Sequence, residues 1–359
     1  MSSPDHEYPV APPVPLKGRG AVANVQGRYE KDERERFDDG WQHTASSDED
    51  GGPPLRTQIF DERAKSILTR NKSPDIPFSV SLNPYRGCEH GCIYYCFARP
   101  THSYLGLSPG LDFESRIYAK INAPELLERE LAKPNYEPEP IALGVNTDAC
   151  QPVERDLQLT RRVIQVLHDC GYPFAAVTKN SLIECDIDLL APMAERGQIM
   201  AAITVTTLDA DIARTLAEAG IPVGVSITPV IPFITEPDME RVLEACAEAG
   251  ATSASYIVLR LPWEVAPLFK DWLAAHFPDR ADRVMSRVRN MRGGKDYDSN
   301  FSTRMKGEDL WADMLRQRFR QATRHLGLNA RQHSILEMSE FQRPAKRAAA
   351  PANLQLDLF

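Results

Sequence analysis

Cys88, Cys92 and Cys96 place three thiols within nine residues, whereas the other cysteines lie apart at positions 150, 170, 185 and 246. Thiolates bind zinc, copper(I) and iron–sulfur clusters, and a structural zinc ion takes four ligands from cysteine and histidine. His90 could be the fourth ligand, but its place between two of the cysteines makes closure around one ion cramped. Three thiolates alone suit a four-iron cluster that leaves one iron open. A disulfide is a weaker interpretation because the number of cysteines is odd.

The residues on both sides of this loop resemble a known superfamily. Ser81-Leu-Asn-Pro-Tyr-Arg-Gly-Cys88 leads into the loop, and Cys96-Phe-Ala-Arg-Pro-Thr-His-Ser-Tyr-Leu-Gly106 follows it. Both stretches resemble the radical S-adenosylmethionine (SAM) superfamily, and within it the spore photoproduct lyase-like branch, also labelled DNA repair photolyase. The resemblance covers roughly residues 15 to 345.

This resemblance implies a set of cofactors and ligands. Cys88, Cys92 and Cys96 would hold a four-iron (4Fe-4S) cluster whose open iron binds SAM. One electron from the cluster would then cleave SAM to a 5′-deoxyadenosyl radical. Tyr95, next to the third cysteine, would lie near the adenine of SAM.

Two features depart from the pattern of the related proteins. Their loop reads Cys-x3-Cys-x2-Cys, whereas this chain has Cys-x3-Cys-x3-Cys, which adds up to about 3.5 Å of chain before Cys96. The loop can absorb the extra residue as a bulge, or the residue can pull Cys96 off the cluster. The related proteins also carry a further helical piece after Thr-Thr-Leu-Asp, which is missing between residues 209 and 217 here. Both departures put full activity in question.

Alternating patterns predict an α/β fold. Apolar runs rich in Val, Ile and Thr predict strands, and apolar positions three and four apart predict the helices between them. Such alternation implies a parallel sheet covered by helices. Six strands would form a partial (βα)6 barrel, the radical SAM architecture that the resemblance also implies. The predicted strands are 79–83, 141–146, 174–178, 200–206, 223–228 and 254–259, and the predicted helices are 123–132, 155–169, 185–195, 209–219 and 237–249.

The carboxyl ends of parallel strands are where α/β proteins place their chemistry. Polar residues follow or end the second to fourth predicted strands, and any one of them alone could be a simple capping or turn residue. Their shared edge favours SAM binding, by Asn146, Asp148, Lys179, Thr204 and Thr206.

Cys150 follows the second predicted strand. Spore photoproduct lyases use a cysteine near the end of the equivalent strand to return a hydrogen atom to the product radical. Cys150 could act as such a donor by proximity, although a small buried apolar residue is the stronger interpretation.

Composition divides the 359 residues, which carry a net charge of −8 and 42% apolar content, into four parts. We expect a disordered acidic arm over 1–75, rich in Pro, Gly, Ser and acid, and a radical SAM core over 76–278. A basic helical extension would cover 279–343, and a flexible tail 344–359. The sequence shows no apolar run long enough to span a bilayer and no charged-then-apolar leader, so we expect a cytoplasmic protein.

The basic extension carries 16 Lys and Arg against 8 Asp and Glu between residues 280 and 350, a local charge of +8. Such a face can neutralise phosphates, and Tyr297 and Phe301 within it can stack on bases. The simpler alternative is a solvated helix surface. We favour DNA binding, through Arg283, Arg287, Arg289, Arg292, Arg304, Lys306, Arg316, Arg318, Arg320 and Arg324.

The last five residues are a second indication of a DNA-associated role. They follow an Ala- and Pro-rich tether and resemble the pentapeptide by which bacterial replication and repair proteins hold the DNA sliding clamp. Such a peptide can fill an apolar pocket and raise the local concentration of the protein at DNA. These residues are Gln355, Leu356, Asp357, Leu358 and Phe359.

The sequence therefore predicts a radical SAM enzyme that acts on DNA, with a lyase-type or repair reaction on a damaged base as first choice. One alternative is a radical SAM enzyme that modifies RNA or a protein, which would share every feature of the barrel. Another is a non-catalytic, clamp-associated DNA-binding protein with a vestigial cluster site.

Overall fold

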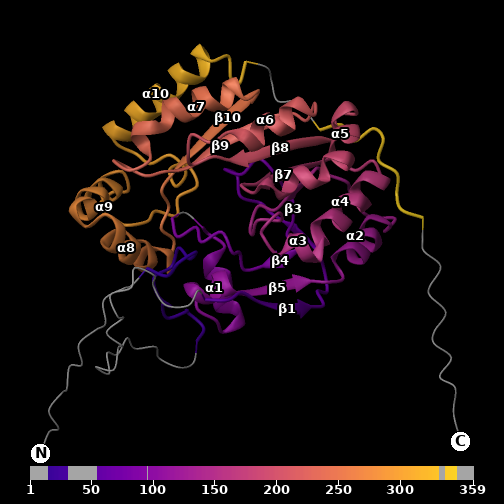
Figure 1. The fold of residues 1–359 in the computed structure, drawn as a ribbon, viewed down its shortest axis with the longest axis horizontal. Coiled ribbons are helices and arrows are strands. Elements are labelled where there is room, and N and C mark those ends of the chain that lie inside the picture. The colour runs from indigo at the N-terminus through magenta and orange to yellow at the C-terminus, as the bar shows by residue number, and fades with distance from the viewer. Residues whose placement is uncertain (1–14, 31–54, 95, 331–335, 346–359) are drawn as a thin grey trace, which may run out of the picture.

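The computed structural model describes residues 15–30, 55–94, 96–330 and 336–345. Its main sheet has seven strands in the order β10-β9-β8-β7-β6-β3-β2 (Figure 1). Six of these strands are parallel and follow one another in chain order, while β2 (Leu68–Arg70) pairs antiparallel with β3. The parallel strands are β3 (Val80–Leu82), β6 (Ile141–Leu143), β7 (Phe174–Thr178), β8 (Ile199–Thr204), β9 (Val223–Val230) and β10 (Ser253–Val258).

Helices connect the parallel strands and cover the outer side of the sheet (Figure 1). Their apolar faces pack with the strands into one large cluster of buried side chains, which confirms the predicted mixed α/β fold with a parallel sheet. The connecting helices are α2 (Ala123–Leu131), α3 (Glu154–Leu157), α4 (Leu159–Asp169), η2 (Ser181–Asp186), α5 (Ile187–Glu195), α6 (Asp211–Glu218), η3 (Glu236–Asp238) and α7 (Met239–Glu248).

The helix predicted over 155–169 is divided in the structure. Gln158, between α3 and α4, has φ of 46°, a left-handed conformation that a continuous helix does not contain. The break follows from local contacts, because the carboxylate of Glu154 accepts a hydrogen bond from the Thr160 backbone nitrogen (2.8 Å). The other predicted helices differ from the observed ones only near their ends.

Part of the range predicted as a disordered arm is folded in the structure. β1 (Gln58–Glu62) pairs with β5 (Arg116–Lys120), which also pairs with β4 (Tyr85–Arg86), so that a second sheet of three strands forms beside the first. Residues 15–30 pack against α1 (Leu111–Ser115), where Val25 shares an apolar cluster with Leu111 and the Ala21 backbone nitrogen donates to Glu114. Tyr29 of the same segment stacks on Tyr104 of η1 (Arg99–Leu105). Composition alone did not predict these contacts, since few of the residues are apolar.

Within the range predicted as a basic extension lie α9 (Ala281–Asn290) and α10 (Leu310–His325), and α8 (Val265–His276) and η4 (Pro278–Arg280) lead into it. α10 packs on α7 and α8 packs on α9, and α8, α9 and α10 lie on the left of the view in Figure 1. None of the helices in the described ranges is both long and apolar enough to cross a membrane.

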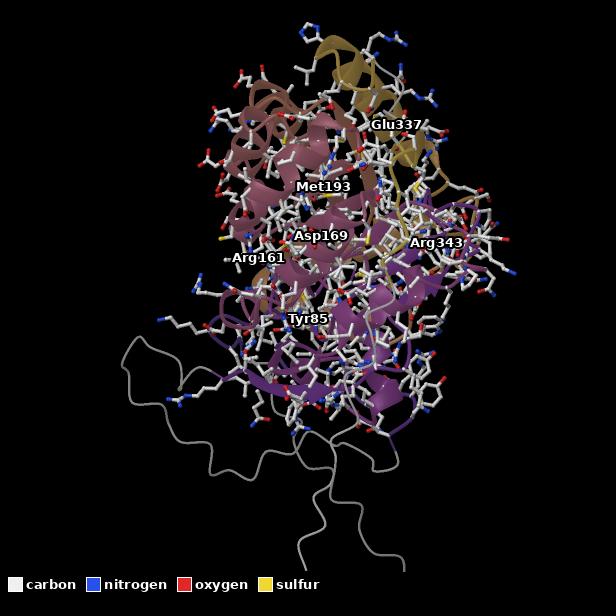
Figure 2. All side chains as sticks on the ribbon, turned by 90° about the vertical axis from the view of Figure 1, so that its right-hand side faces the viewer. Tyr85, Arg161, Asp169, Met193, Glu337 and Arg343 are labelled. Carbon is white, nitrogen blue, oxygen red and sulfur yellow. The ribbon has the colours of Figure 1, made fainter. Side chains whose placement is uncertain are left out.

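The last described residues, 336–345, run back across the helices. Their backbone nitrogens at Glu337 and Gln342 donate to the carbonyl oxygens of Gly197 (3.0 Å) and Cys170 (2.8 Å), which follow α5 and α4. Glu337 and Arg343 mark this segment in Figure 2. Because these helix ends precede the next strands, the segment lies at the amino edge of the sheet, opposite the edge where the strands end.

Candidate functional site

The cysteine loop, residues 88–96, follows β4 near the carboxyl ends of the parallel strands. Arg99, which is fully buried, anchors it from the first turn of η1. Its Nε donates to the Cys92 carbonyl oxygen (2.7 Å), and one terminal nitrogen donates to the carbonyl oxygens of Pro109 and Gly110 (3.0 Å each). The other terminal nitrogen forms an ion pair with the buried carboxylate of Glu114. The loop is therefore fixed by a buried charge.

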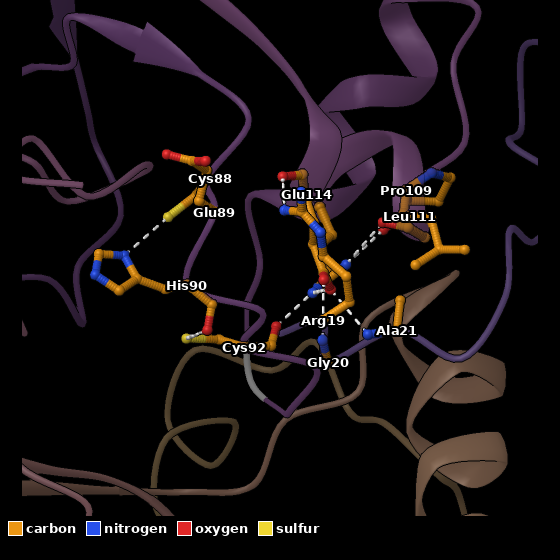
Figure 3. Close-up of polar contacts among 12 residues, drawn as sticks. Arg19, Gly20, Ala21, Cys88, Glu89, His90, Cys92, Pro109, Leu111 and Glu114 are labelled. Atoms are coloured by element: carbon orange, nitrogen blue, oxygen red, sulfur yellow. Dashed lines mark hydrogen bonds and ion pairs between the residues drawn. The ribbon is translucent and has the colours of Figure 1, made fainter. Parts of the chain in front are cut away.

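Glu114 also ties the N-terminal segment to this loop. Its two carboxylate oxygens accept hydrogen bonds from the backbone nitrogens of Gly20 and Ala21 (2.9 Å each; Figure 3). A Cβ atom at Gly20 would lie 1.6 Å from the carbonyl oxygen of Gly91, so only glycine allows this close approach. Sequence reasoning missed Arg99 and Glu114, although Arg99 stood in the stretch that carries the family resemblance.

The three thiols differ in their surroundings. Cys88 is buried, with its Sγ 3.3 Å from His90 Nδ1, and Cys96 is half-buried beside it in a small cluster. Burial raises the pKa of the Cys88 thiol, as does the nearby carboxylate of Asp148, and burial also raises the pKa of Cys96. Cys92 Sγ instead accepts a hydrogen bond from the Lys179 ammonium at 2.9 Å.

Asp148 joins the cysteine loop to the ends of β6 and β7. Its Oδ1 accepts from Thr178 Oγ1 (2.7 Å) and from the Cys150 backbone nitrogen (2.9 Å), and its Oδ2 accepts from the Lys179 backbone nitrogen (3.0 Å). His90 Nδ1 lies 3.6 Å from Asp148 Oδ2. Two of the predicted SAM-binding residues, Asp148 and Lys179, thus lie directly beside the cysteines.

His90, which the sequence suggested only as a possible metal ligand, lies beside Cys88 and Asp148. Its Nε2 lies 3.0 Å from the side-chain nitrogen of Asn180, so the ring bridges the cysteine loop and the segment after β7. Burial lowers the pKa of His90, which favours the neutral ring. A neutral imidazole in this place fixes the loop through hydrogen bonds.

The remaining predicted site residues lie in different surroundings, and only some of them are at the edge where the cysteine loop lies. The Asn146 backbone nitrogen donates to the Asn83 side chain (2.8 Å), which holds it at the same edge of the sheet. Thr204 ends β8 and is half-buried, but Thr206 lies beyond the strand and is exposed, so the predicted strand extends past the observed one. Cys150 is buried in the main apolar cluster. Tyr95 lies outside the described residues.

The arrangement of the donor atoms distinguishes a single metal ion from a cluster. Among the residues that the structure describes, no three His, Cys, Asp or Glu side chains surround one point closely enough to bind a single ion. A preformed zinc site is therefore not present there. In a four-iron cluster each thiolate binds a different iron, so the sulfurs need not converge on one point. Three thiols on one anchored loop, one of them beside an ammonium group, fit that kind of group.

Acidic partners engage several arginines of the predicted basic face. Arg318 forms ion pairs with Glu236 and Glu240, and Arg304 binds both oxygens of Asp75 (2.5 and 2.7 Å). The charge count of the sequence therefore overstates the free positive charge of this surface. Further ion pairs join Arg287 to Asp309, Arg289 to Asp296 and Arg316 to Asp313.

Comparisons with known proteins identify relatives of unknown function. A scan against protein-family models finds no match. Uncharacterized proteins of Mycobacterium bovis and Mycobacterium tuberculosis are 33% identical over 247 residues, which cover 63% of this chain and 72% of each relative. An uncharacterized protein of Methanocaldococcus jannaschii is 23% identical over 250 residues, which cover 65% of this chain and 89% of that protein.

Solved structures of spore photoproduct lyase show a distant likeness to this chain. The complex with dinucleoside spore photoproduct matches at a TM-score of 0.49 and 13% identity. A mutant with bound AdoMet and the same dinucleoside matches at a TM-score of 0.48 and 13% identity. Each match covers 75% of this chain and 80% of the other. A likeness at this level carries no functional assignment.

Proposed function

The chain belongs to one family with the uncharacterized mycobacterial proteins, and for this member we propose the activity of a radical SAM iron–sulfur enzyme that acts on DNA. The sheet would form a partial (βα)6 barrel with the cysteine loop at its mouth. The observation that carries the proposal is the contact of the Cys88-x3-Cys92-x3-Cys96 loop with Asp148 and Lys179 at the carboxyl edge of the parallel strands.

The three cysteines would bind a 4Fe-4S cluster, which with bound SAM supplies a 5′-deoxyadenosyl radical for hydrogen-atom abstraction. The chain's own residues would hold and shield this site. Arg99 and Glu114 hold the loop in place through their buried ion pair. Residues 15–30 contact the loop through the close approach of Gly20 to Gly91, which would limit access of water to a bound cluster.

The residues at the strand ends would hold SAM. Lys179 is the one cation in direct contact with a thiol of the loop in the described part of the chain, and it would pair with the SAM carboxylate. Asp148 would orient Lys179 and receive the SAM ammonium group. Asn146 and Thr204 would contact the remaining polar groups of SAM, together with Tyr95 and Thr206.

The reaction we propose is of the lyase or repair type on a damaged base. The buried position of Cys150 in the apolar cluster supports a packing role for this thiol rather than hydrogen donation. Its backbone nitrogen nevertheless donates to Asp148 (2.9 Å), so a substitution of Cys150 that shifts the backbone would also move Asp148.

Anaerobic reconstitution with iron and sulfide tests the enzymatic proposal. We expect about four irons per chain, and release of 5′-deoxyadenosine after reduction in the presence of SAM. A variant with Cys88, Cys92 and Cys96 changed to alanine should do neither. A variant with Cys185 changed to alanine is the matched control, since Cys185 is exposed and lies outside the loop. A wild-type chain that binds no cluster would instead support the non-catalytic, clamp-associated alternative.

The DNA part of the proposal is supported by exposed cations and by the tail. Within the described residues, Lys306, Arg320 and Arg324 are exposed and form no ion pair. The last described residues, 336–345, lie at the amino edge of the sheet, whereas the cysteine loop lies near its carboxyl edge, so a clamp bound to Gln355–Phe359 would leave the loop free. These five residues lie outside the described part.

A pull-down with the bacterial sliding clamp tests the tail. Deletion of residues 355–359 should abolish clamp capture without a change in the thermal stability of the protein. Absence of clamp capture by the full chain would favour modification of RNA or a protein over action on DNA.

A further inference from the structure

Arg292 is a buried cation whose hydrogen-bonding capacity is only partly used. It follows α9 and is 4% exposed. One terminal nitrogen donates to the Leu259 carbonyl oxygen at 2.7 Å. The Nε and the other terminal nitrogen are buried and have no hydrogen-bond partner among the described residues. A buried donor on a charged group that finds no acceptor is strongly unfavourable.

A second buried arginine lies beside it. Arg260 is 6% exposed and stands two residues after β10, at the carboxyl edge of the sheet. One of its terminal nitrogens donates to the Tyr297 hydroxyl at 3.2 Å. Burial and the nearby charge of Arg260 lower the pKa of Arg292 to about 10, as expected for two cations that share a site from which water is excluded.

The carboxylates nearest to this pair are bound to other groups. Asp298 accepts hydrogen bonds from Thr303 Oγ1 (2.6 Å) and from the Asn300 backbone nitrogen (3.1 Å). Asp75 is held by two nitrogens of Arg304. No hydrogen bond or ion pair joins either carboxylate to Arg292 within the described residues, so the charge of Arg292 has no bound carboxylate there.

The turn that follows Arg292 faces open space. Gly293 and Gly294 follow it directly, and a Cβ atom at either would meet nothing within 4 Å. Lys295 comes next and is exposed. The site also adjoins the cysteine loop, because Leu259 and Leu261, on either side of Arg260, belong to the apolar cluster against which Tyr94 of the loop packs.

From these contacts we propose that Arg292 and Arg260 bind a phosphate group that reaches them past the Gly293–Lys295 turn. A guanidinium group presents donors in one plane that match two oxygens of a phosphate, and the unused Nε and terminal nitrogen of Arg292 are such donors. Lys295 adds an exposed cation at the entrance. The identification of this group as a phosphodiester of DNA rests on the proposed function, whereas the phosphate site itself does not.

Thermal unfolding of the protein as purified, without a reconstituted cluster, tests the site. Inorganic phosphate should raise the midpoint of the wild-type chain more than chloride at equal ionic strength, with a saturating dependence on concentration. Arg292→Met and Lys295→Glu should each weaken phosphate binding about tenfold or more, since both remove charge-assisted contacts. Arg129→Glu changes the charge of an exposed residue on α2, away from this site, and should leave phosphate binding unchanged.

Two results would overturn the phosphate site: no phosphate-specific shift in the wild-type chain, or an unchanged apparent Kd in the Lys295→Glu variant. The second applies even if Arg292→Met does not fold, because Lys295 is on the surface. Competition by a short single-stranded oligonucleotide then identifies the source. Displacement of phosphate supports a nucleic-acid phosphodiester, and its absence assigns the site to a free phosphate compound and refutes the DNA identification. Cluster formation does not enter this test, so it fails or succeeds independently of the enzymatic proposal.

Discussion

Replacement of Glu114 by glutamine should destabilise the protein at the cysteine loop. Glu114 and Arg99 are both fully buried and form an ion pair. Glutamine keeps the size of the side chain but removes its charge, and it turns one acceptor into a donor that faces the backbone nitrogens of Gly20 and Ala21. Arg99 is then left as a buried, uncompensated cation.

The expected loss follows from this arrangement. Removing one partner of a buried ion pair costs about 3–5 kcal/mol, because the remaining charge stays buried. The ratio of folded to unfolded protein should therefore fall by a factor between ~10² and ~10⁴. Arg99 keeps its hydrogen bonds to the carbonyl oxygens of Cys92, Pro109 and Gly110, which places the loss nearer the lower value.

Urea unfolding followed by circular dichroism measures this loss. The control is Glu125→Gln, an exposed position on α2, which should change the free energy of unfolding by less than about 0.5 kcal/mol. Limited proteolysis should also cleave residues 15–30 faster in the Glu114→Gln variant. A loss below about 1 kcal/mol, with unchanged proteolysis, would show that the buried pair does not hold the loop.

Three further substitutions probe the site and its support. Lys179→Met removes the cation beside Cys92 and should slow alkylation of that thiol by iodoacetamide about tenfold, as measured by peptide mass spectrometry. Burial lowers the pKa of His102 from 6.5 to about 4, so between these pH values the unfolded chain binds a proton that the folded chain does not. The free energy of unfolding should therefore fall by about 3 kcal/mol as the pH drops from 6.5 to 4. His102→Gln should flatten this part of the urea stability profile, and an unchanged slope would contradict the assignment. Gly20→Ala puts a Cβ atom 1.6 Å from the Gly91 carbonyl oxygen, so proteolysis should release residues 15–30, and a protected segment would contradict the close packing.

The strands were predictable because their apolar runs are buried on both sides of a parallel sheet. Residues 174–178 alternate between fully and partly buried positions as β7, and the same pattern marks β8 up to Thr204. The predicted strand ends two residues after β8: the Val205 backbone nitrogen still donates to Ser226 of β9 (3.0 Å), and Thr206, despite its strand-forming side chain, is exposed beyond the strand. β-propensity describes a side chain and does not report where pairing stops.

The support of the cysteine loop was not predictable from local patterns. Glu114 meets Gly20 across 94 residues of sequence, and Arg304 meets Asp75 across 229. Contacts of this kind depend on the tertiary fold, so a charge count could not show which arginines of the extension are neutralised. The sequence did place Asp148 and Lys179 beside the cysteines, because strand ends in a parallel sheet share one edge.

Electron paramagnetic resonance of the reconstituted, reduced protein tests the central claim most directly. A 4Fe-4S cluster held by Cys88, Cys92 and Cys96 leaves one iron without a protein ligand, so addition of SAM should change the spectrum of the reduced cluster. We expect a Lys179→Met variant to lose SAM binding, so adding SAM should leave the spectrum of its reduced cluster unchanged. A cluster whose spectrum does not respond to SAM in the wild-type chain, or the absence of any four-iron signal, would contradict the account.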